Sequence, residues 1–132
     1  MDQRLPKYER LRGKKQLDRL FSEGKSFFLS PFRVLYLTED DGDEGRPPVR
    51  MAVAVPRRLF KKAVKRNLVK RRIREAYRRN KILLAGPLDE NRKKMDVVFI
   101  YAVPEILSYQ EIEEKIVLSL HKILKEDEKA PH

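Results

Sequence analysis

Residues 63–84 constrain this chain more than any other segment, because they combine an apolar stripe with a strongly basic face. At 100° per residue, six side chains fall within a sector of roughly 120°. They are Val69, Ile73, Ala76, Tyr77, Leu83 and Leu84. On the opposite side, within about 60° of one another, lie Asn67, Arg71, Arg74 and Arg78. The apolar stripe of such a helix can lie on a sheet, and its basic face then points outward.

The excess positive charge of the chain lies in one region. The 132 residues carry 31 Lys and Arg against 20 Asp and Glu, a formal net charge of +11. Thirteen of these basic residues and one acid, Glu75, lie between Arg57 and Lys81, so this region has a charge of +12 and the remainder −1. Like charges at helical spacing repel by about 0.2–0.5 kcal/mol per pair. Phosphate contacts offset that cost, so the pattern predicts polyanion binding rather than a solvated face.

Basic segments also occur in zipper proteins and in nuclear localisation signals. A zipper needs heptads after its basic region. The sequence LLAGP (83–87) instead predicts the end of the helix, with Gly86 as a left-handed cap and Pro87 blocking continuation. A localisation signal usually lies on an exposed tail, whereas here a predicted strand precedes the segment and its own apolar stripe docks it. Both alternatives are therefore disfavoured.

The first half of the chain predicts a small domain that begins with a helix. Residues 1–14 form a basic, loosely ordered arm, and a helix over 15–23 stops at Gly24. Residues 26–40 are rich in aromatic and β-branched side chains and predict extended structure. A turn over 39–48 separates them from a strand over 49–56.

The second half adds a strand and a helix. The apolar run at 95–104 has strand length and predicts a buried central strand. Ser108 and Glu111 form a capping box. The helix that follows reaches about Lys125 and repeats an apolar residue every four positions, at Ile112, Ile116, Leu120 and Leu124. Residues 126–132 predict a frayed tail. The whole chain reads as one α+β domain, 1–132.

The histidines and acids predict no active site, and the apolar runs predict no membrane segment. Cys is absent, and the two histidines, His121 and His132, build no nucleophile pair or zinc site. The dense acids match no EF-hand loop and predict a soluble turn that keeps RNA away; they are Glu39, Asp40, Asp41, Asp43 and Glu44. No apolar run approaches the ~18 residues of a membrane span, and the start lacks a signal-peptide core. We therefore expect a cytoplasmic protein.

The stretch KRNLVKRRIREAYR (65–78) resembles the RNR-motif helix of the bacterial ribonuclease P protein family. That motif runs A-x-x-R-N-R-x-K-R-x-x-R-x-x-[FY], and Leu68 replaces its second Arg. The matching residues are Ala63, Arg66, Asn67, Lys70, Arg71, Arg74 and Tyr77. LRGKKQLDRLFSEGK, FRVLY and VAVPRRLFKKAVKRN are similar to other family segments, so the resemblance covers about residues 9–125. It implies an αβββαβα sandwich with a left-handed βαβ crossover through the basic helix, against the general chirality rule.

The resemblance also implies a function. The family's protein subunit binds the catalytic RNA of ribonuclease P and the 5′ leader of precursor tRNA. It assists the Mg²⁺-dependent endonucleolytic removal of that leader. Because the RNA catalyses the reaction and holds the Mg²⁺, the resemblance implies no catalytic residue, metal site or cofactor in the protein, and no obligate protein partner.

The implied site residues divide between the two RNAs. Those matching positions that face the catalytic RNA are Arg57, Arg58, Lys61, Lys62, Arg66, Asn67, Lys70, Arg71, Arg74 and Arg78. Those matching the leader-binding cleft are Leu17, Phe21 and Tyr36, with Leu17 where the family usually has Phe. Phe27, Phe28 and Phe32 are assigned to the core.

Two other functions stay open on the sequence. A structural ribosomal protein is equally small, basic and free of Cys, although such proteins more often carry long basic tails, and here the charge lies within the domain. A protein-only, metal-dependent nuclease would cleave precursor tRNA without added RNA.

Overall fold

The computed structural model describes residues 5–40 and 45–129. The elements, in chain order, are η1 (Lys7–Glu9), α1 (Lys14–Glu23), β1 (Lys25–Leu29), β2 (Phe32–Asp40), β3 (Val49–Ala54), α2 (Ala63–Asn80), α3 (Ile82–Glu90), β4 (Lys93–Tyr101) and α4 (Tyr109–Lys129). This order confirms the αβββαβα arrangement, with a short 3-10 turn before it and α3 added after the basic helix.

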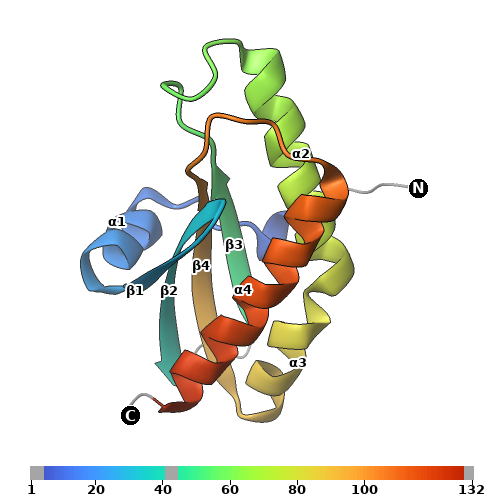
Figure 1. The fold of residues 1–132 in the computed structure, drawn as a ribbon. Helices are drawn as coiled ribbons and strands as arrows, with labels where there is room; N and C mark the ends of the chain where they lie inside the picture. Colours follow the sequence, from blue (N-terminus) through green and yellow to red (C-terminus); the bar gives the residue numbers. More distant parts are fainter. Residues whose placement is uncertain (1–4, 41–44, 130–132) are drawn as a thin grey trace.

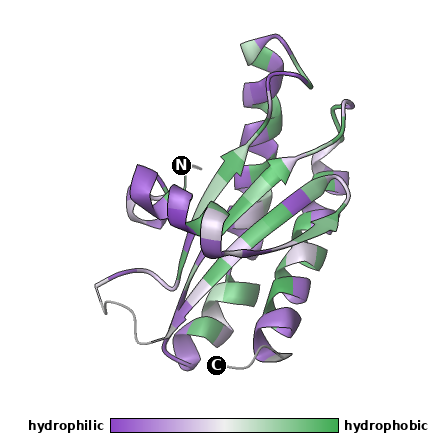
Figure 2. Cartoon of the chain, turned by 90° about the vertical axis from the view of Figure 1, so that its left-hand side faces the viewer, coloured by the Kyte–Doolittle hydropathy of each residue, from purple (hydrophilic) through white to green (hydrophobic). Residues whose placement is uncertain are grey.

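The four strands form one mixed sheet in the order β1-β2-β4-β3. β2 runs antiparallel to both of its neighbours, and β3 runs parallel to β4. α2 and α3 connect these parallel strands, and Figures 1 and 2 together show the left-handed crossover that the resemblance implies. Figure 1 also shows α2, α3 and α4 on one side of the sheet, here called the α4 side, and α1 on the other, the α1 side.

The main core lies on the α4 side. Alternate residues of β4, among them Val97, Phe99 and Tyr101, meet the buried stripes of α2 and α4. As predicted, β4 is central and buried on both faces. The predicted stripe is confirmed within α2, where Val69, Ile73, Ala76 and Tyr77 are all at most 1% exposed. Its last two members lie in α3, where Leu84 is buried and Leu83 is half-buried. The capping box forms as expected: Glu111 N–H donates to Ser108 Oγ, and Ser108 N–H donates to the Glu111 carboxylate.

A smaller cluster holds α1 against the opposite side of the sheet. Leu20 of α1 contacts Leu35 of β2 and Val98 of β4, with Leu11 completing the cluster. Gly24 ends the helix as predicted. A side chain there would collide with the Leu20 carbonyl oxygen, so glycine allows α1 to turn directly into β1.

The predicted end of the basic helix is wrong. α2 ends at Asn80, and Gly86 and Pro87 lie inside α3 instead of terminating a helix. Gly86 does not have a positive φ; among the residues that the structure describes, the positive φ, 57°, belongs to Arg92. An interior proline costs about 3 kcal/mol. Leu84 and Leu88 of α3 are both fully buried, and each such leucine contributes about 1.5–3 kcal/mol, enough to offset the proline.

The two ends of the described chain are more ordered than predicted. Leu5 and Leu11 are buried, and Leu11 N–H donates to the carbonyl of Met51 in β3, so residues 5–13 are docked rather than a loose arm. At the other end, α4 continues to Lys129. Thr38 Oγ1 donates to the buried Asp127 carboxylate at 2.6 Å. This hydrogen bond holds the last turns of α4, which were predicted to fray. The acids Asp41, Asp43 and Glu44 lie outside the described residues.

Candidate nucleic-acid interface

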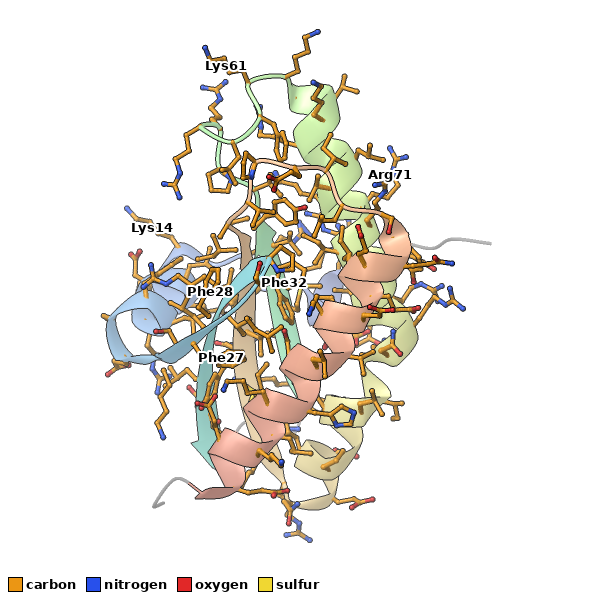
Figure 3. The ribbon with its side chains drawn as sticks, viewed as in Figure 1. Lys14, Phe27, Phe28, Phe32, Lys61 and Arg71 are labelled. Carbon is orange, nitrogen blue, oxygen red and sulfur yellow. The ribbon has the colours of Figure 1, made fainter. Side chains whose placement is uncertain are left out.

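The loop between β3 and α2 presents four cations at the end of the sheet. Phe60 is 7% exposed and packs against Tyr101 with ring centroids 6.1 Å apart, which anchors the loop in the core. The cations around this anchor are all exposed: Arg57, Arg58, Lys61 and Lys62. Figure 3 shows Lys61 pointing away from the body of the molecule. The loop therefore holds predicted site residues in place by burying an apolar neighbour.

Arg66 fastens this loop to α2. Its Nη1 donates to the carbonyl oxygens of Phe60 and Lys61, both at 2.8 Å. Arg66 was predicted to contact RNA, and in this structure its guanidinium holds the loop before α2.

The start of α2 is electrostatically unfavourable in the isolated protein. The N-terminal end of a helix carries a partial positive charge, and acids in the first turn stabilise it. The first turn of α2 contains no acid and follows Lys61 and Lys62 directly. Backbone N–H groups at this end, together with these ammonium groups, suit an anion such as phosphate.

The predicted row along α2 is exposed over most of its length. Asn67, Arg71 and Arg74 are all exposed, and Arg71 points away from α1 in Figure 3. Lys70 beside them is half-buried. Arg78 differs, because its Nη2 and Nε donate to the Glu75 carboxylate at 2.6 and 3.0 Å. This bidentate contact lowers the pKa of Glu75 and uses the only acid of α2.

The row gains a cation from the N-terminal segment. Arg10 Nε donates to the Leu5 carbonyl at 2.9 Å. Partial desolvation and the charge of Arg10 both lower the pKa of Arg74. Two guanidinium groups therefore repel each other at this point, and an anion between them would relieve the repulsion. Arg10 was not among the predicted site residues, because only the folded chain brings residue 10 beside α2.

Two further arginines of α2 hold the helix in place. Arg72 Nη1 donates to the Leu107 carbonyl at 2.6 Å, just before α4. Arg79 lies over the ring of Tyr109, 6.0 Å from its centroid. Both side chains connect α2 to the start of α4. They act as positioning residues, and the sequence pattern does not distinguish them from Arg71 and Arg74.

The three residues predicted for the leader cleft do not meet. Leu17 and Phe21 project from α1, and Phe21 is 55% exposed. Tyr36 is 3% exposed and lies in the main core on the α4 side. Side chains alternate along a strand, so Tyr36 shares the core face with Phe32 and Val34. The β2 residue that faces α1 is Leu35, and the expectation for Tyr36 is corrected accordingly.

On the α1 side, ion pairs cover one end of the sheet. Asp96 of β4 is held by Arg46 at 2.6 Å and by Arg50 at 2.9 Å. Glu39 of β2 is bound by Arg46 and Arg19. At the other end, Figure 2 shows no helix of the described chain over the sheet surface beside α1. The strand residues Ala54 and Ile100 are paired in the register of β3 and β4 at this end, and both are half-buried.

Residues 5–40 and 45–129 contain no group of three His, Cys, Asp or Glu side chains placed to hold a metal ion. Over the same ranges, no helix is both long and apolar enough to cross a membrane.

Together these features define a small basic α+β domain with a cationic helix docked across a parallel strand pair. The sequence matches the ribonuclease P family over residues 5–124. It is 38% identical over 120 residues to the ribonuclease P protein component of Porphyromonas gingivalis, covering 90% of this chain and 85% of that one. The chain therefore belongs to the ribonuclease P protein family.

Solved structures agree. The ribonuclease P protein from Thermotoga maritima superimposes with a TM-score of 0.68 and 30% identity, covering 86% of this chain and 96% of that chain. The Staphylococcus aureus ribonuclease P protein, at 23% identity, has the same fold with a TM-score of 0.66 over 89% of this chain and 95% of that one.

Proposed function

We propose that this protein is the subunit of ribonuclease P that binds the catalytic RNA and the 5′ leader of precursor tRNA. The observation that carries the proposal is the uncompensated charge along α2. Lys61 and Lys62 lie at the positive end of the helix with no acid in its first turn, and Arg71 and Arg74 are exposed beyond them. This arrangement destabilises the free protein and suits an RNA backbone.

The catalytic RNA binds the loop before α2 and the exposed row. Its phosphates lie against Arg57, Arg58, Lys61 and Lys62 and continue along Asn67, Lys70, Arg71 and Arg74. Contacts of this kind fix the position of an RNA without reading its sequence. Arg66, Arg72 and Arg79 contribute by keeping the loop and the helix in place.

The leader binds the α1 side of the sheet, between α1 and the uncovered strand surface. Single-stranded RNA is held by stacking on aromatic rings beside cations. Phe21 supplies an exposed ring on α1, and Leu17 lies next to it without one. The α2 row and this surface lie on different sides of the molecule, so both RNAs can bind at once.

The reaction is endonucleolytic removal of the leader, and the RNA subunit catalyses it with Mg²⁺. The protein holds the leader and reduces the repulsion between two polyanions, and both effects lower the Mg²⁺ concentration that the reaction needs. The proposal places this work in the cytoplasm, where tRNA precursors are made and processed.

Binding of precursor and mature tRNA tests the leader site. We expect the protein to increase the affinity of the RNA subunit for precursor tRNA more than for mature tRNA, which has no leader. An equal increase in affinity for both tRNAs would show that the protein does not bind the leader. Cleavage of precursor tRNA by the protein with Mg²⁺ and no RNA subunit would favour a protein-only nuclease instead.

A further inference from the structure

Phe28 is exposed on the α1 side of the sheet, although its sequence context predicted a place in the core. It is 62% exposed in the edge strand β1, whereas its neighbours Phe27 and Phe32 contribute to the main core on the α4 side. Because side chains alternate along a strand, Phe28 faces the same side as α1.

An arginine lies directly beside this ring. In the antiparallel register of β1 and β2, Phe28 is paired with Arg33. Side chains at such positions have Cβ atoms about 4.5–5.5 Å apart on the same face. Arg33 is exposed, and within the described part of the chain it forms no ion pair. An aromatic ring and an unpaired guanidinium therefore share one patch of surface.

The charge around the pair favours an anionic ligand. On the α1 side of the described strands, the acids Glu39 and Asp96 are both bound by arginines. Neither carboxylate is therefore available to neutralise Arg33. A patch that combines an exposed ring with an uncompensated cation has the chemistry that holds an unpaired nucleotide: the base stacks on the ring and the phosphate meets the cation.

On α1 and the adjoining face of β2, one side chain is a ring that a leader could use. Leu17 of α1 and Leu35 of β2 face this side of the sheet, and neither can stack on a base. Phe21 is the exposed ring of α1. Phe28 and Arg33 extend the same side of the sheet to its edge and would add a second ring.

We propose that Phe28 and Arg33 form a base-stacking platform that binds one nucleotide of the 5′ leader at the β1 edge. This inference rests on the proposed leader site and adds a contact outside the residues assigned to it above. Phe28 holds the base and Arg33 the adjoining phosphate.

The chain offers a direct probe, because it contains no Trp. Phe28→Trp introduces a single indole at the platform. In the reconstituted holoenzyme, precursor tRNA should quench its fluorescence by stacking, and mature tRNA should not. As a matched control, Ile82→Trp places an indole at a 70% exposed position in α3, where neither tRNA should change the emission.

Affinity provides the second readout. Phe28→Ala should weaken binding of precursor tRNA roughly 5- to 150-fold, the range for one base stacked on an aromatic residue, and leave binding of mature tRNA unchanged. Phe28→Tyr, which keeps a ring, should restore it. Arg33→Gln should weaken precursor binding and flatten its salt dependence.

The outcomes distinguish a failure of the Phe28 and Arg33 platform from a failure of the proposed leader site. If the wild-type holoenzyme does not prefer precursor over mature tRNA, the proposed leader site fails. If the preference is present but Phe28→Ala and Arg33→Gln preserve it, the platform is wrong. A change in self-association of Phe28→Ala, measured by sedimentation with leader binding intact, would assign the patch to a protein contact and also overturn the platform.

Discussion

Arg72 Nη1 donates a hydrogen bond of 2.6 Å to the carbonyl oxygen of Leu107, 35 residues further along the chain. Arg71, the preceding residue, is exposed and points to solvent. Adjacent arginines on one helix therefore serve different purposes: Arg72 fixes α2 to the segment before α4, and Arg71 presents charge. The same division separates Arg66 and Arg79 from Arg74.

This division predicts different results for neighbouring substitutions. Arg71→Ala should weaken association with the catalytic RNA and reduce the magnitude of the log K against log salt slope by about 0.7–0.9, the value of one phosphate contact. The free energy of unfolding should change by less than about 0.5 kcal/mol. Salt titrations of RNA binding and urea unfolding measure the two quantities.

Arg72→Ala is the matched control. Loss of a hydrogen bond from a charged group should lower the free energy of unfolding by about 1.5–3 kcal/mol. The salt slope of RNA binding should stay near the wild-type value. Identical effects for both variants would show that α2 is not divided in this way.

Phe21→Ala should weaken binding of precursor tRNA to the holoenzyme by about 1–3 kcal/mol, because a stacked base loses its ring. Binding of mature tRNA should stay nearly constant. Because Phe21 is 55% exposed, the melting temperature of the free protein should change little. A large drop in melting temperature would identify Phe21 as a packing residue instead.

Tyr77→Phe should stabilise the protein. The Tyr77 hydroxyl is buried and has no hydrogen-bond partner among the described residues, and burial raises the pKa of this phenol. An unsatisfied buried hydroxyl costs about 1–3 kcal/mol, so its removal should raise the free energy of unfolding by about 1 kcal/mol. A loss of stability in urea unfolding would mean that the hydroxyl has a partner in solution.

The position of Tyr36 predicts a pH dependence. Burial, followed by the charges of Glu126 and Asp127, raises the pKa of Tyr36 to about 12. An unfolded tyrosine ionises near 10. The folded state therefore prefers the neutral phenol, and stability that is complete below about pH 10 is lost as the pH rises toward 12.

Tyr36→Phe removes this contribution. Below about pH 9, the difference in free energy of unfolding between wild type and variant should be constant. Between about pH 10 and 12, the wild type should lose stability relative to the variant. A difference that stays constant up to pH 12 would place the Tyr36 phenol in contact with water.

Local sequence signals predicted most of the fold. The capping box at Ser108, Gly24 at the end of α1 and the apolar run of β4 each depend on neighbouring residues, and each prediction is confirmed. The end of α2 was missed, because Pro87 is tolerated only through the burial of Leu84 and Leu88 in the tertiary structure. Asp127 was missed for the same reason, since its partner Thr38 lies 89 residues away.

The charge of the site could be predicted from the sequence, but the roles of its individual residues could not. Helical spacing identified the face that carries Arg71 and Arg74, but it could not separate these from Arg72, whose partner lies beyond the helix. Strand alternation groups Tyr36 with Phe32 and Val34, which already contradicts a place beside Phe21. The exposure of Phe28 depends on which side of β1 the helices cover, and only the fold determines that.

Reconstitution with a bacterial ribonuclease P RNA at low Mg²⁺ tests the central claim most directly. The rate of 5′ leader removal from precursor tRNA is measured with the RNA alone, with the protein alone and with both. We predict negligible cleavage by either component and efficient cleavage by the pair, reduced by Arg71→Ala and Arg74→Ala together. If the protein does not stimulate cleavage by the RNA at any Mg²⁺ concentration, or cleaves the precursor without it, the account is contradicted.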